Sequence, residues 1–452
     1  MIRFNLSILL LVLFVFSCSK NEISKPIKIE HSTPEWSKNL SIYELNIRQF
    51  SEEGTFKAIE KRLDELKEMN VGIIWLMPIH EIGELNRKGS LGSYYAVKDY
   101  KDVHPDYGTK QDFQDLVNAI HDKGMYVIID WVANHTSWDN VWVKTNPEFY
   151  TKNDKGEYIP PVEDWADVID LNYDNTELRT AMIDALAYWV KEFDIDGYRC
   201  DVAGEVPTEF WNDARKQLDS IKPVFMLAEA EQEEHHAKAF DMSYGWEMHH
   251  YFNEIAKGNK NVNDLIELIE KENHRFDKAA YRMRFVDNHD ENSWNGTIQE
   301  RMGDAASALI VLSATLPGMP LLYSGDEAGL DKRLAFFEKD PIEWKEHPNR
   351  VLFTKLFTLK KENSALFNGE FGSDLEILSV SDKNVIVFKR KKDQNEVFVF
   401  INLSNKKISK QFDKSVFTEK TYSNYFGNYE METTLGWDVN FEPWQYEVLV
   451  SK

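Results

Sequence analysis

Short apolar runs alternate with longer amphipathic runs along the chain from Trp36 to about residue 365. The apolar runs lack the polar alternation of a half-exposed strand, which predicts strands that are buried on both faces. We expect these strands at 40–47, 71–77, 125–130, 195–200, 224–228, 240–243, 283–286 and 320–323.

The amphipathic runs between these strands have the period of helices. Alternating strands and helices fit either a doubly wound sheet or a (β/α)8 barrel. Eight strands over about 330 residues favour the barrel, so the expected fold class is α/β, with a TIM barrel at 36–365. The main helices are expected at 56–69, 111–123, 176–192, 261–272, 302–315 and 350–362.

Two regions depart from this alternation. The segment 136–175, after the third strand, is longer than an ordinary connection between a strand and a helix, which predicts a short insertion subdomain. In residues 366–452, runs rich in β-branched and aromatic residues are separated by polar turns, which predicts a C-terminal all-β sandwich domain. Its strands are expected at 375–380, 385–390, 396–403 and 446–450.

The N-terminal 35 residues differ from the rest of the chain. A basic residue precedes the apolar run 8–16, which is too short to span a bilayer and is typical of a secretory signal peptide at residues 1–17. The sequence Val-Phe-Ser-Cys at 15–18 resembles the cleavage box of bacterial lipoproteins, in which the cysteine, here Cys18, carries lipid. Residues 18–35 would then be a lipid-linked tether. An ordinary signal peptide with a chance cysteine is the alternative.

This resemblance places the protein in the cell envelope after secretion, attached to a membrane by its lipid on the outer-membrane or periplasmic side. The formal net charge of -23 repels phosphate backbones, which excludes nucleic acid as a partner and favours a neutral ligand. Aromatic residues make up 13% of the chain, which suits either stacking platforms for sugars or large core side chains. The second cysteine, Cys200, lies in an apolar run and is expected to be a core residue without a redox role.

Charged and imidazole side chains follow four of the predicted strands. Each has an ordinary explanation when taken alone, such as a helix cap or a solvated turn. Because the carboxyl ends of barrel strands meet at one mouth, where barrel enzymes have their active sites, we expect these side chains to converge. They are Asn134 and His135 after the third strand, Arg199 and Asp201 at the end of the fourth, Glu229 after the fifth, and His289 and Asp290 after the seventh.

These residues stand in four short motifs that resemble those of the α-amylase superfamily of glycoside hydrolases, in the same order and with similar spacing. The resemblance covers about 36–452 and includes Gly325-Asp326-Glu327-Ala328-Gly329 after the eighth strand. The motifs are Asp130-x-Val132-x-Asn134-His135, Gly197-x-Arg199-x-Asp201, Glu229 and Asn288-His289-Asp290.

The resemblance implies a role for each residue. Asp201 would be the catalytic nucleophile, Glu229 the general acid and base, and Asp290 the group that stabilises the distorted sugar. A tyrosine in the segment 91–100 would stack on the sugar at the cleavage point. The residues implied to bind substrate are Tyr95, His135, Arg199 and His289.

Elementary electrostatics agrees with this division of roles. Retaining glycoside hydrolysis needs one ionised and one protonated carboxyl group, about 5–5.5 Å apart. The guanidinium of Arg199, two residues before Asp201, favours the ionised form of that carboxyl. Glu229 follows the apolar run 224–228, so burial and the nearby carboxylates should raise its pKa until it can donate a proton.

The sequence departs from the family pattern after the nucleophile. Gly204-Glu205 stands where starch-liquefying α-amylases typically have a Lys and a His that help to bind substrate and calcium, and the run 201–206 is closer to the neopullulanase and cyclomaltodextrinase type. Calcium is therefore an open question as cofactor, with Asn134 as a candidate ligand. The segment 153–157 resembles a calcium loop but is more simply a polar turn, and Ser93 stands where many relatives have a sugar-binding His.

The leading hypothesis is an α-amylase-type hydrolase that cleaves α-1,4-glucosidic bonds of starch-like α-glucans and maltooligosaccharides with retention. A neopullulanase-like or cyclomaltodextrinase-like hydrolase, an α-glucosidase and a transglycosylase would share this chemistry. They would differ in the loops 79–94, 136–170 and 291–298, which set chain-length preference and endo or exo action. An inactive glycan-binding surface lipoprotein is the alternative from another class, although such proteins usually lose one of the three carboxylates.

Overall fold

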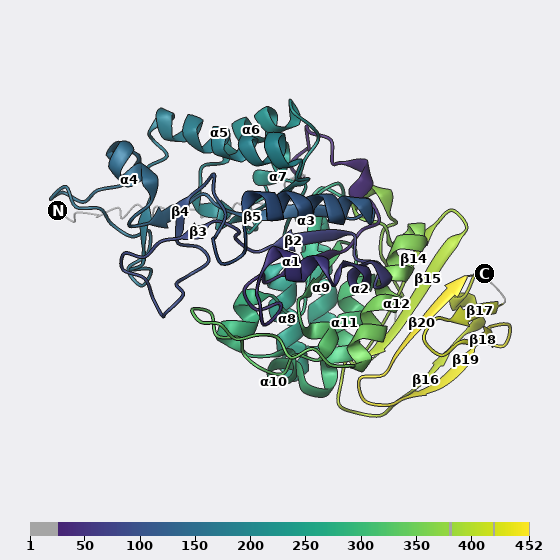
Figure 1. Ribbon diagram of the computed structural model, residues 1–452. Coiled ribbons are helices and arrows are strands. Elements are labelled where there is room, and N and C mark those ends of the chain that lie inside the picture. Colours follow the sequence, from purple (N-terminus) through teal and green to yellow (C-terminus); the bar gives the residue numbers. More distant parts are fainter. Residues whose placement is uncertain (1–25, 379–381, 419–420, 452) are drawn as a thin grey trace, which may run out of the picture.

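The computed structural model describes residues 26–378, 382–418 and 421–451. The predicted signal peptide and Cys18 lie outside the described residues. A barrel surrounded by helices forms the larger part of the molecule, and a smaller β-domain lies beside it (Figure 1). None of the helices in the described ranges is long and apolar enough to cross a membrane.

Eight parallel strands close into a barrel, which confirms the predicted (β/α)8 fold class. Their order around the barrel is β1-β12-β11-β10-β9-β8-β5-β2, so each barrel strand lies beside the one that follows it in the chain. Each strand overlaps one of the eight predicted apolar runs. The strands are β1 Ile42–Leu45, β2 Ile73–Leu76, β5 Tyr126–Val132, β8 Gly197–Asp201, β9 Phe225–Ala228, β10 Met242–Tyr244, β11 Tyr281–Arg284 and β12 Met319–Tyr323.

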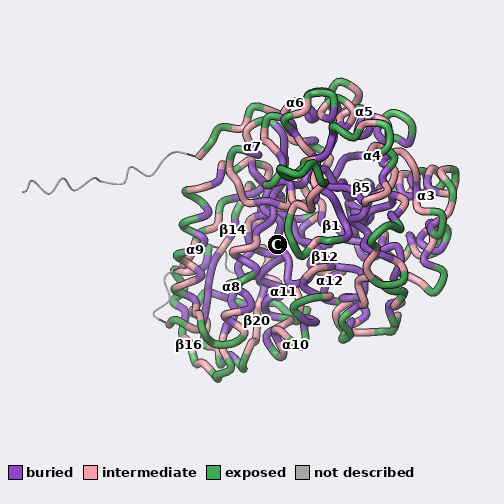
Figure 2. Tube along the Cα trace, turned by 90° about the vertical axis from the view of Figure 1, so that its left-hand side faces the viewer, coloured by how far each residue is buried: buried purple, intermediate pink, exposed green. Residues whose placement is uncertain are grey.

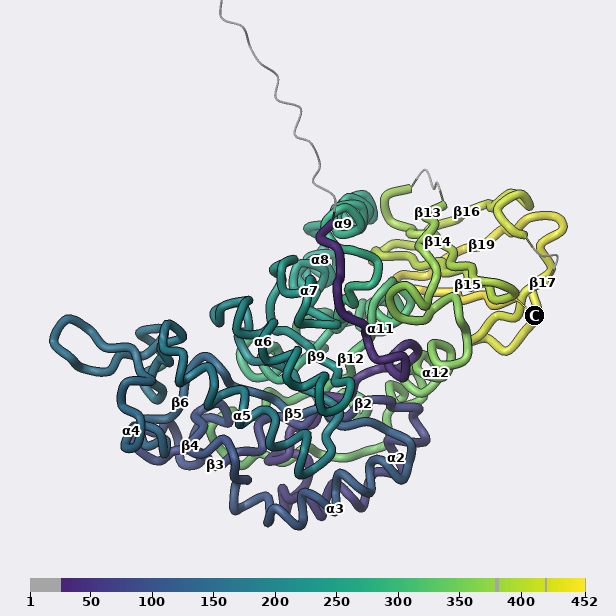
Figure 3. Tube along the Cα trace, turned by 90° about the horizontal axis from the view of Figure 1, so that it is seen from above, coloured from purple at the N-terminus to yellow at the C-terminus, as the bar shows by residue number. Residues whose placement is uncertain are grey.

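Helices cover the outside of the barrel (Figures 1 and 3). The run 56–69 forms two helices instead of the predicted one, because the chain turns at Arg62, whose guanidinium packs 3.5 Å from the centre of the Trp344 ring. The helix expected at 302–315 is likewise divided in two. The helices are α1 Phe56–Glu60, α2 Leu63–Glu68, α3 Lys110–Asp122, α5 Thr176–Phe193, α6 Thr208–Asp219, α7 His235–Lys238, α8 Trp246–Ala256, α9 Val262–Arg275, α10 Ile298–Met302, α11 Ala306–Thr315 and α12 Pro348–Glu362.

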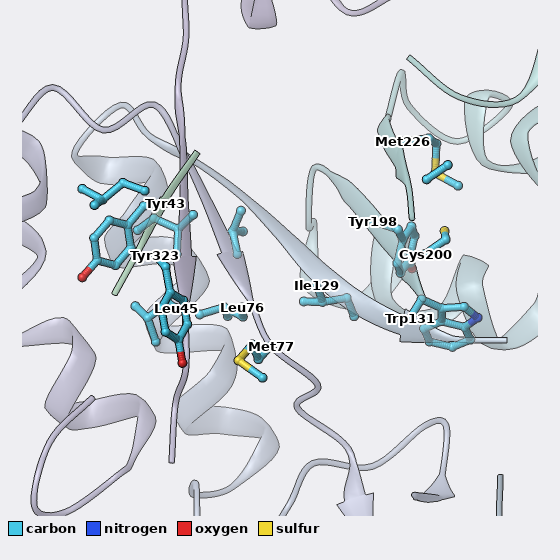
Figure 4. Close-up of a cluster of buried hydrophobic side chains, with 14 of the residues drawn as sticks. Tyr43, Leu45, Leu76, Met77, Ile129, Trp131, Tyr198, Cys200, Met226 and Tyr323 are labelled. Carbon is cyan, nitrogen blue, oxygen red and sulfur yellow. The ribbon is translucent and has the colours of Figure 1, made fainter. Parts of the chain in front are cut away.

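Side chains of the barrel strands alternate between the interior of the barrel and the layer of helices. Outward-facing residues such as Leu76, Ile129 and Trp131 pack into the main core between strands and helices (Figure 4). Inward-facing residues such as Ile42 and Ile128 form a separate apolar cluster. Two residues further along these strands the interior side chains are Glu44 and Asp130. The barrel interior is therefore apolar near the amino ends of the strands and charged near their carboxyl ends. Figure 2 shows how the buried chain is concentrated at the centre of the molecule.

Two connections at the carboxyl ends of the strands carry small sheets of their own. In the loop after β2, β3 (Glu81–Ile82) pairs antiparallel with β4 (Val97–Asp99). After β5, β6 (His135–Ser137) pairs antiparallel with β7 (Val168–Asp170), and α4 (Val141–Thr145) lies between them in sequence. The second pair forms the base of the insertion predicted at 136–175.

The C-terminal region is all-β, as predicted, with a six-stranded antiparallel sheet and a separate two-stranded sheet. The four strands from β16 to β19 were not predicted, because they are short and largely polar and so carry little apolar signal. The strands are β13 Glu376–Ile377, β14 Val385–Lys392, β15 Asn395–Asn402, β16 Ile408–Phe412, β17 Thr421–Asn424, β18 Tyr429–Glu432, β19 Trp437–Phe441 and β20 Tyr446–Ser451.

The end of the segment predicted as a tether lies against the barrel. The backbone N–H of Glu30 donates to the carbonyl of Ala237, and Arg215 Nη2 donates to the carbonyl of Ser32. Trp36 then stacks on Tyr126, at the start of β5, with the ring centres 3.9 Å apart. The chain therefore enters the domain at the amino ends of the barrel strands, opposite the mouth (Figure 3).

Candidate active site

A pocket of about 630 Å³ opens at the mouth of the barrel. It brings together all three predicted carboxylates and three of the four residues predicted to bind substrate. Aromatic residues that were not predicted, Trp165, Trp294, Phe336 and Phe337, complete much of its wall. The predicted residues in the lining are Tyr95, His135, Asp201, Glu229, His289 and Asp290.

The register of two neighbouring strands places the first two carboxyl groups side by side. Strands β8 and β9 run parallel with Cys200 opposite Ala228, so Asp201, the last residue of β8, and Glu229, the residue after β9, come next on the two strands. Asp290 instead lies six residues beyond the end of β11 and reaches the pocket from the following loop. The local sequence thus fixes the first two groups more tightly than the third.

Arg199 lies directly beneath the carboxyl groups. Its guanidinium is fully buried, with Nη1 2.9 Å from Asp201 Oδ1 and 2.9 Å from Asp130 Oδ1, and with Nη2 2.8 Å from Glu229 Oε2. The rings of Trp75, Tyr95 and Tyr244 surround it at 5.1 to 5.7 Å. Arg199 was predicted to bind substrate, but it does not line the pocket. Its contacts are those of a positioning residue that holds two catalytic candidates at fixed places.

The carboxyl groups around Arg199 have raised proton affinity. Burial raises the pKa of Glu229 to about 7, helped by the charges of Asp201 and Asp290 and opposed by Arg199. This is the direction expected from the apolar run before Glu229. Burial also raises the pKa of Asp201 to about 6, because it outweighs the attraction of Arg199. Of the two groups, Glu229 therefore holds its proton to the higher pH.

A strained residue separates the nucleophile candidate from the rest of its loop. Val202 has φ of 35° and ψ of 46°, a left-handed conformation that a β-branched residue rarely adopts. In this conformation its backbone N–H donates to Glu229 Oε2 at 2.8 Å. Strain of this kind persists where the surrounding structure enforces it, as in active sites. Here it gives Glu229 a backbone donor that helps to fix the carboxyl group.

His289 belongs to a buried hydrogen-bonded chain in which Tyr95 and His289 were predicted and Glu44 was not. Its Nδ1 lies 2.5 Å from Oε1 of Glu44, a fully buried residue in the middle of β1, and its Nε2 lies 2.7 Å from the hydroxyl of Tyr95. Burial alone would lower the pKa of His289, but Asp290 and Glu44 raise it to about 9. The signal that could have identified Glu44 is an acidic residue inside an apolar strand.

The pKa of His135 is shifted in the opposite direction from that of His289. Burial lowers its pKa to about 4, so it is a neutral imidazole at the pocket wall, with its ring edge-on to Trp165 at 5.4 Å. Its Nδ1 lies 3.3 Å from the amide nitrogen of Asn134. A neutral and a charged imidazole therefore face the same pocket and can serve different hydroxyl groups of a ligand.

Asn134 and Asn153, which belong to the segments considered for calcium, each make local hydrogen bonds. The part of the chain that the structure describes contains no group of three or more His, Cys, Asp or Glu arranged to hold a metal ion. Asn134 donates its amide toward His135, and Asn153 Oδ1 accepts from the backbone N–H groups of Lys155 and Glu157, as in a polar turn.

Comparison with known proteins identifies the family. The family model described as alpha amylase, catalytic domain, matches residues 30–166 and 162–402. Alpha-amylase 3 of Dictyoglomus thermophilum is 24% identical over 84% of this chain and 88% of its own length. The intracellular maltogenic amylase of Bacillus subtilis is 30% identical over 78% of this chain and 62% of its own length.

Solved structures give the same result. The crystal structure of a noncanonic maltogenic alpha-amylase from Thermotoga neapolitana superposes with a TM-score of 0.84, at 30% identity, over 92% of this chain and 99% of that one. An alpha-amylase from Lactobacillus plantarum superposes with a TM-score of 0.83 at 29% identity, over 92% of this chain and 100% of that one. The fold, the match to the family model and the acidic pocket agree, and the chain belongs to the α-amylase family of glycosidases.

Proposed function

We propose that this protein hydrolyses α-1,4-glucosidic bonds of starch-like α-glucans and maltooligosaccharides with retention of configuration. The observation that carries the proposal is the arrangement around Arg199, which holds Asp201 and Glu229 at the ends of adjacent strands. Aromatic side chains at the pocket suit stacking on sugar rings. The relatives named as α-amylases and maltogenic amylases support an α-glucan substrate.

Two carboxyl groups carry the reaction, and Glu229 changes from acid to base between its two steps. Glu229, protonated because of its raised pKa, gives its proton to the glycosidic oxygen as that bond breaks. The Asp201 carboxylate forms a bond to the anomeric carbon, which yields a glycosyl ester. Glu229, now ionised, removes a proton from water, and the water oxygen displaces Asp201 from the same carbon. Two inversions at one carbon leave the product in the α configuration.

The other pocket residues bind and orient the sugar. The ring of Tyr95 is positioned to stack on the sugar at the cleavage point, and Asp290 and the charged His289 can bind its hydroxyl groups. His135, which is neutral, can either donate or accept a hydrogen bond. The proposal therefore gives each predicted residue in the lining a contact with the reacting sugar.

A cyclomaltodextrinase-like or neopullulanase-like activity is the second candidate, and one observation favours it. The residue three positions after Asp201 is Gly204, which lies against the flexible end of the Gln232 side chain. The Lys and His that typically follow the nucleophile in starch-liquefying α-amylases are replaced by this Gly and the exposed Glu205. The difference lies close to the catalytic candidates and affects which leaving sugars bind.

A product profile distinguishes these candidates. The purified protein would be assayed on starch, pullulan, cyclodextrin and maltotriose, and early products would be followed by NMR. An α-amylase type prefers starch, whereas a cyclomaltodextrinase type prefers cyclodextrin. Retention predicts that the α-anomer accumulates first, and an initial β-anomer would contradict the mechanism. Absence of hydrolysis on all four substrates would instead favour the inactive glycan-binding protein.

We also propose that the protein is anchored to a membrane of the cell envelope by lipid on Cys18. The chain enters the barrel at the amino ends of the strands, so an anchor there would leave the mouth directed away from the membrane. Expression of the full chain with radiolabelled palmitate tests this. Label in the wild type and none in Cys18→Ser is the expected result, and an unlabelled wild type would exclude the anchor.

A further inference from the structure

We propose that a braced wall closes the glycone end of the pocket, so that the enzyme binds the non-reducing ends of maltooligosaccharides and acts as an exo-hydrolase. The wall consists of residues 88–92, from the loop after β2, and residues 335–338, from the loop after β12. The inference rests on the proposed function, since it concerns how the same pocket admits its substrate.

The two segments of the wall are joined directly. The backbone N–H of Leu91 donates to the carbonyl of Phe337 at 3.0 Å, and the backbone N–H of Ser90 donates to Glu338 Oε1 at 2.8 Å. Gly89 has φ of 66°, and a Cβ atom there would lie 2.4 Å from Cβ of Phe337. This close backbone approach leaves no passage for a glucan chain between the two segments.

A buried brace holds both segments from the adjacent loop after β1. Arg48, only 4% exposed, donates to the carbonyls of Leu91 and Gly92 in one segment and of Phe336 in the other, at 3.0 to 3.2 Å. Its guanidinium also packs over the ring of Tyr94 at 4.0 Å.

Gln49, beside Arg48 in the chain, is fully buried and donates to the carbonyls of Ala335 and Glu338. Its own side-chain oxygen accepts from the backbone N–H of Asp340 at 2.6 Å. Each of these carbonyls has a fixed donor, so the wall is built into the fold rather than placed by a mobile loop.

The wall continues to the insertion on its other side. Nζ of Lys88 lies 3.0 Å from Asp167 Oδ1 and 2.6 Å from the carbonyl oxygen of Asp164. All three residues line the pocket. The barrier therefore runs without a break from the insertion, across the loop after β2, to the loop after β12. The contacts of Lys88 are half-exposed, which makes this the part of the wall that is easiest to open.

The order of the strands shows which end of the substrate meets the wall. In the closed barrel β9 and β1 lie opposite each other, four strands apart in either direction. Glu229 follows β9, and as proton donor it must stand beside the leaving group, on the aglycone side. The wall extends over β2, β1 and β12, so it stands across the mouth from Glu229, on the glycone side. Sugars beyond those that the pocket holds would have to pass through it.

A pair of chromogenic substrates tests the wall directly. 4-Nitrophenyl maltoheptaoside would be compared with the same compound carrying an ethylidene group on its non-reducing end, with no coupling enzyme present and with the loss of each substrate followed by chromatography. We expect the blocked substrate to be cleaved at least about 100-fold more slowly, because the closed end rejects the added group. Equal cleavage of both would overturn the wall while leaving the proposed function intact. No cleavage of either would overturn the proposed function itself.

Opening the wall should relax this selectivity. In the double variant Lys88→Ala with Glu338→Ala, the cleavage rate of the blocked substrate relative to the free substrate should rise at least about tenfold. The reason is that the variant loses the contacts of Lys88 with the insertion and of Glu338 with Ser90. Lys271→Ala is the matched control, because Lys271 has a similarly exposed ion pair, with Glu247, but does not line the pocket. An unchanged ratio in a folded double variant, shown by its melting curve, would mean that the wall does not exclude the blocked end.

Discussion

Two buried networks of arginine and acidic residues in this molecule have opposite effects on the pKa values of their carboxyl groups. In the barrel mouth, Arg199 alone faces three carboxyl groups, Asp130, Asp201 and Glu229. On the outer face of β11, two arginines face two glutamates: Arg284 binds both oxygens of Glu272 at 3.1 and 2.7 Å, and Arg282 contacts Glu231 at 2.7 Å. The first network has an excess of acid, and the second has matched charges.

The difference in charge balance reverses the proton affinities. Burial alone would raise the pKa of Glu272, but Arg284 and Arg282 outweigh it and lower that pKa. In the mouth burial dominates and raises the pKa of Glu229 to about 7. Burial thus raises the carboxyl pKa in both networks, and the ratio of cations to carboxylates decides whether the final pKa is raised or lowered. A shortage of cations produces a group that can donate a proton near neutral pH, at a cost in stability.

The largest expected effect is that of Asp201→Asn, which removes the nucleophile and one excess negative charge. We expect turnover to fall by at least about 1,000-fold, as for other single catalytic groups. The folded-state pKa of Asp201 is raised, so its contribution to stability is present at low pH and lost as pH rises through about 6. The variant should therefore melt at an equal or higher temperature than wild type at pH 8. Retained activity would contradict the role of Asp201 as nucleophile. A large loss of stability at pH 8 would contradict the claim that the network at the mouth costs stability.

The matching change in the second network is Glu272→Gln, which leaves Arg282 and Arg284 without their shared partner. Loss of one member of a buried pair costs about 3–5 kcal/mol in the free energy of unfolding, measurable by denaturant titration. The folded protein should keep its kcat, because β11 presents these side chains away from the pocket. In the control, Glu300→Gln breaks an exposed pair with Arg333 and should leave the unfolding midpoint unchanged. A stable, inactive Glu272→Gln protein would contradict the assignment of this network to stability.

The sequence predicted the barrel well because its strands are buried on both faces and therefore read as uninterrupted apolar runs. It predicted that Asp201 and Glu229 would meet because each stands at the end of such a run, and parallel strands end together. Helices α6 and α8 lie between predicted strands, where helical stretches were expected, but their bounds were not predicted. Strand β17 was missed because half of its residues face solvent and few are apolar.

The rest of the site depends on contacts between distant parts of the chain. Glu44 and His289 are 245 residues apart, and Arg48 and Phe336 are 288 apart, so no local pattern relates them. The position of Arg199 below the pocket could not be predicted either, because its place in the sequence of β8 does not show how deep the pocket is. Depth depends on the side chains that fill the barrel, Trp75 and Tyr244 above all.

The smallest expected effect is that of a change at Glu44, which tests whether this residue belongs to the excess of negative charge at the barrel mouth. Glu44→Gln removes a charge but keeps an oxygen that can accept from His289 Nδ1, so activity at pH 6.5 should fall by less than about tenfold. The pKa of His289 should fall below its wild-type value of about 9, because one of the two carboxylates that raise it is gone. NMR titration of the histidine ring protons measures this shift.

The pH dependence of the stability of Glu44→Gln is a second test of the change in the His289 pKa. The folded-state pKa of His289 is raised from its ordinary value of 6.5 to about 9, so its stabilising contribution is complete below 6.5 and lost as pH rises through 9. With the pKa reduced, the melting temperature of Glu44→Gln should depend less steeply on pH between 6.5 and 9. Glu327→Gln is the matched control, since Glu327 is buried nearby but bound to Tyr43, and it should not change the titration of His289. If His289 still titrates near 9 in Glu44→Gln, Asp290 alone holds its charge, and the acidic network ends at the pocket surface.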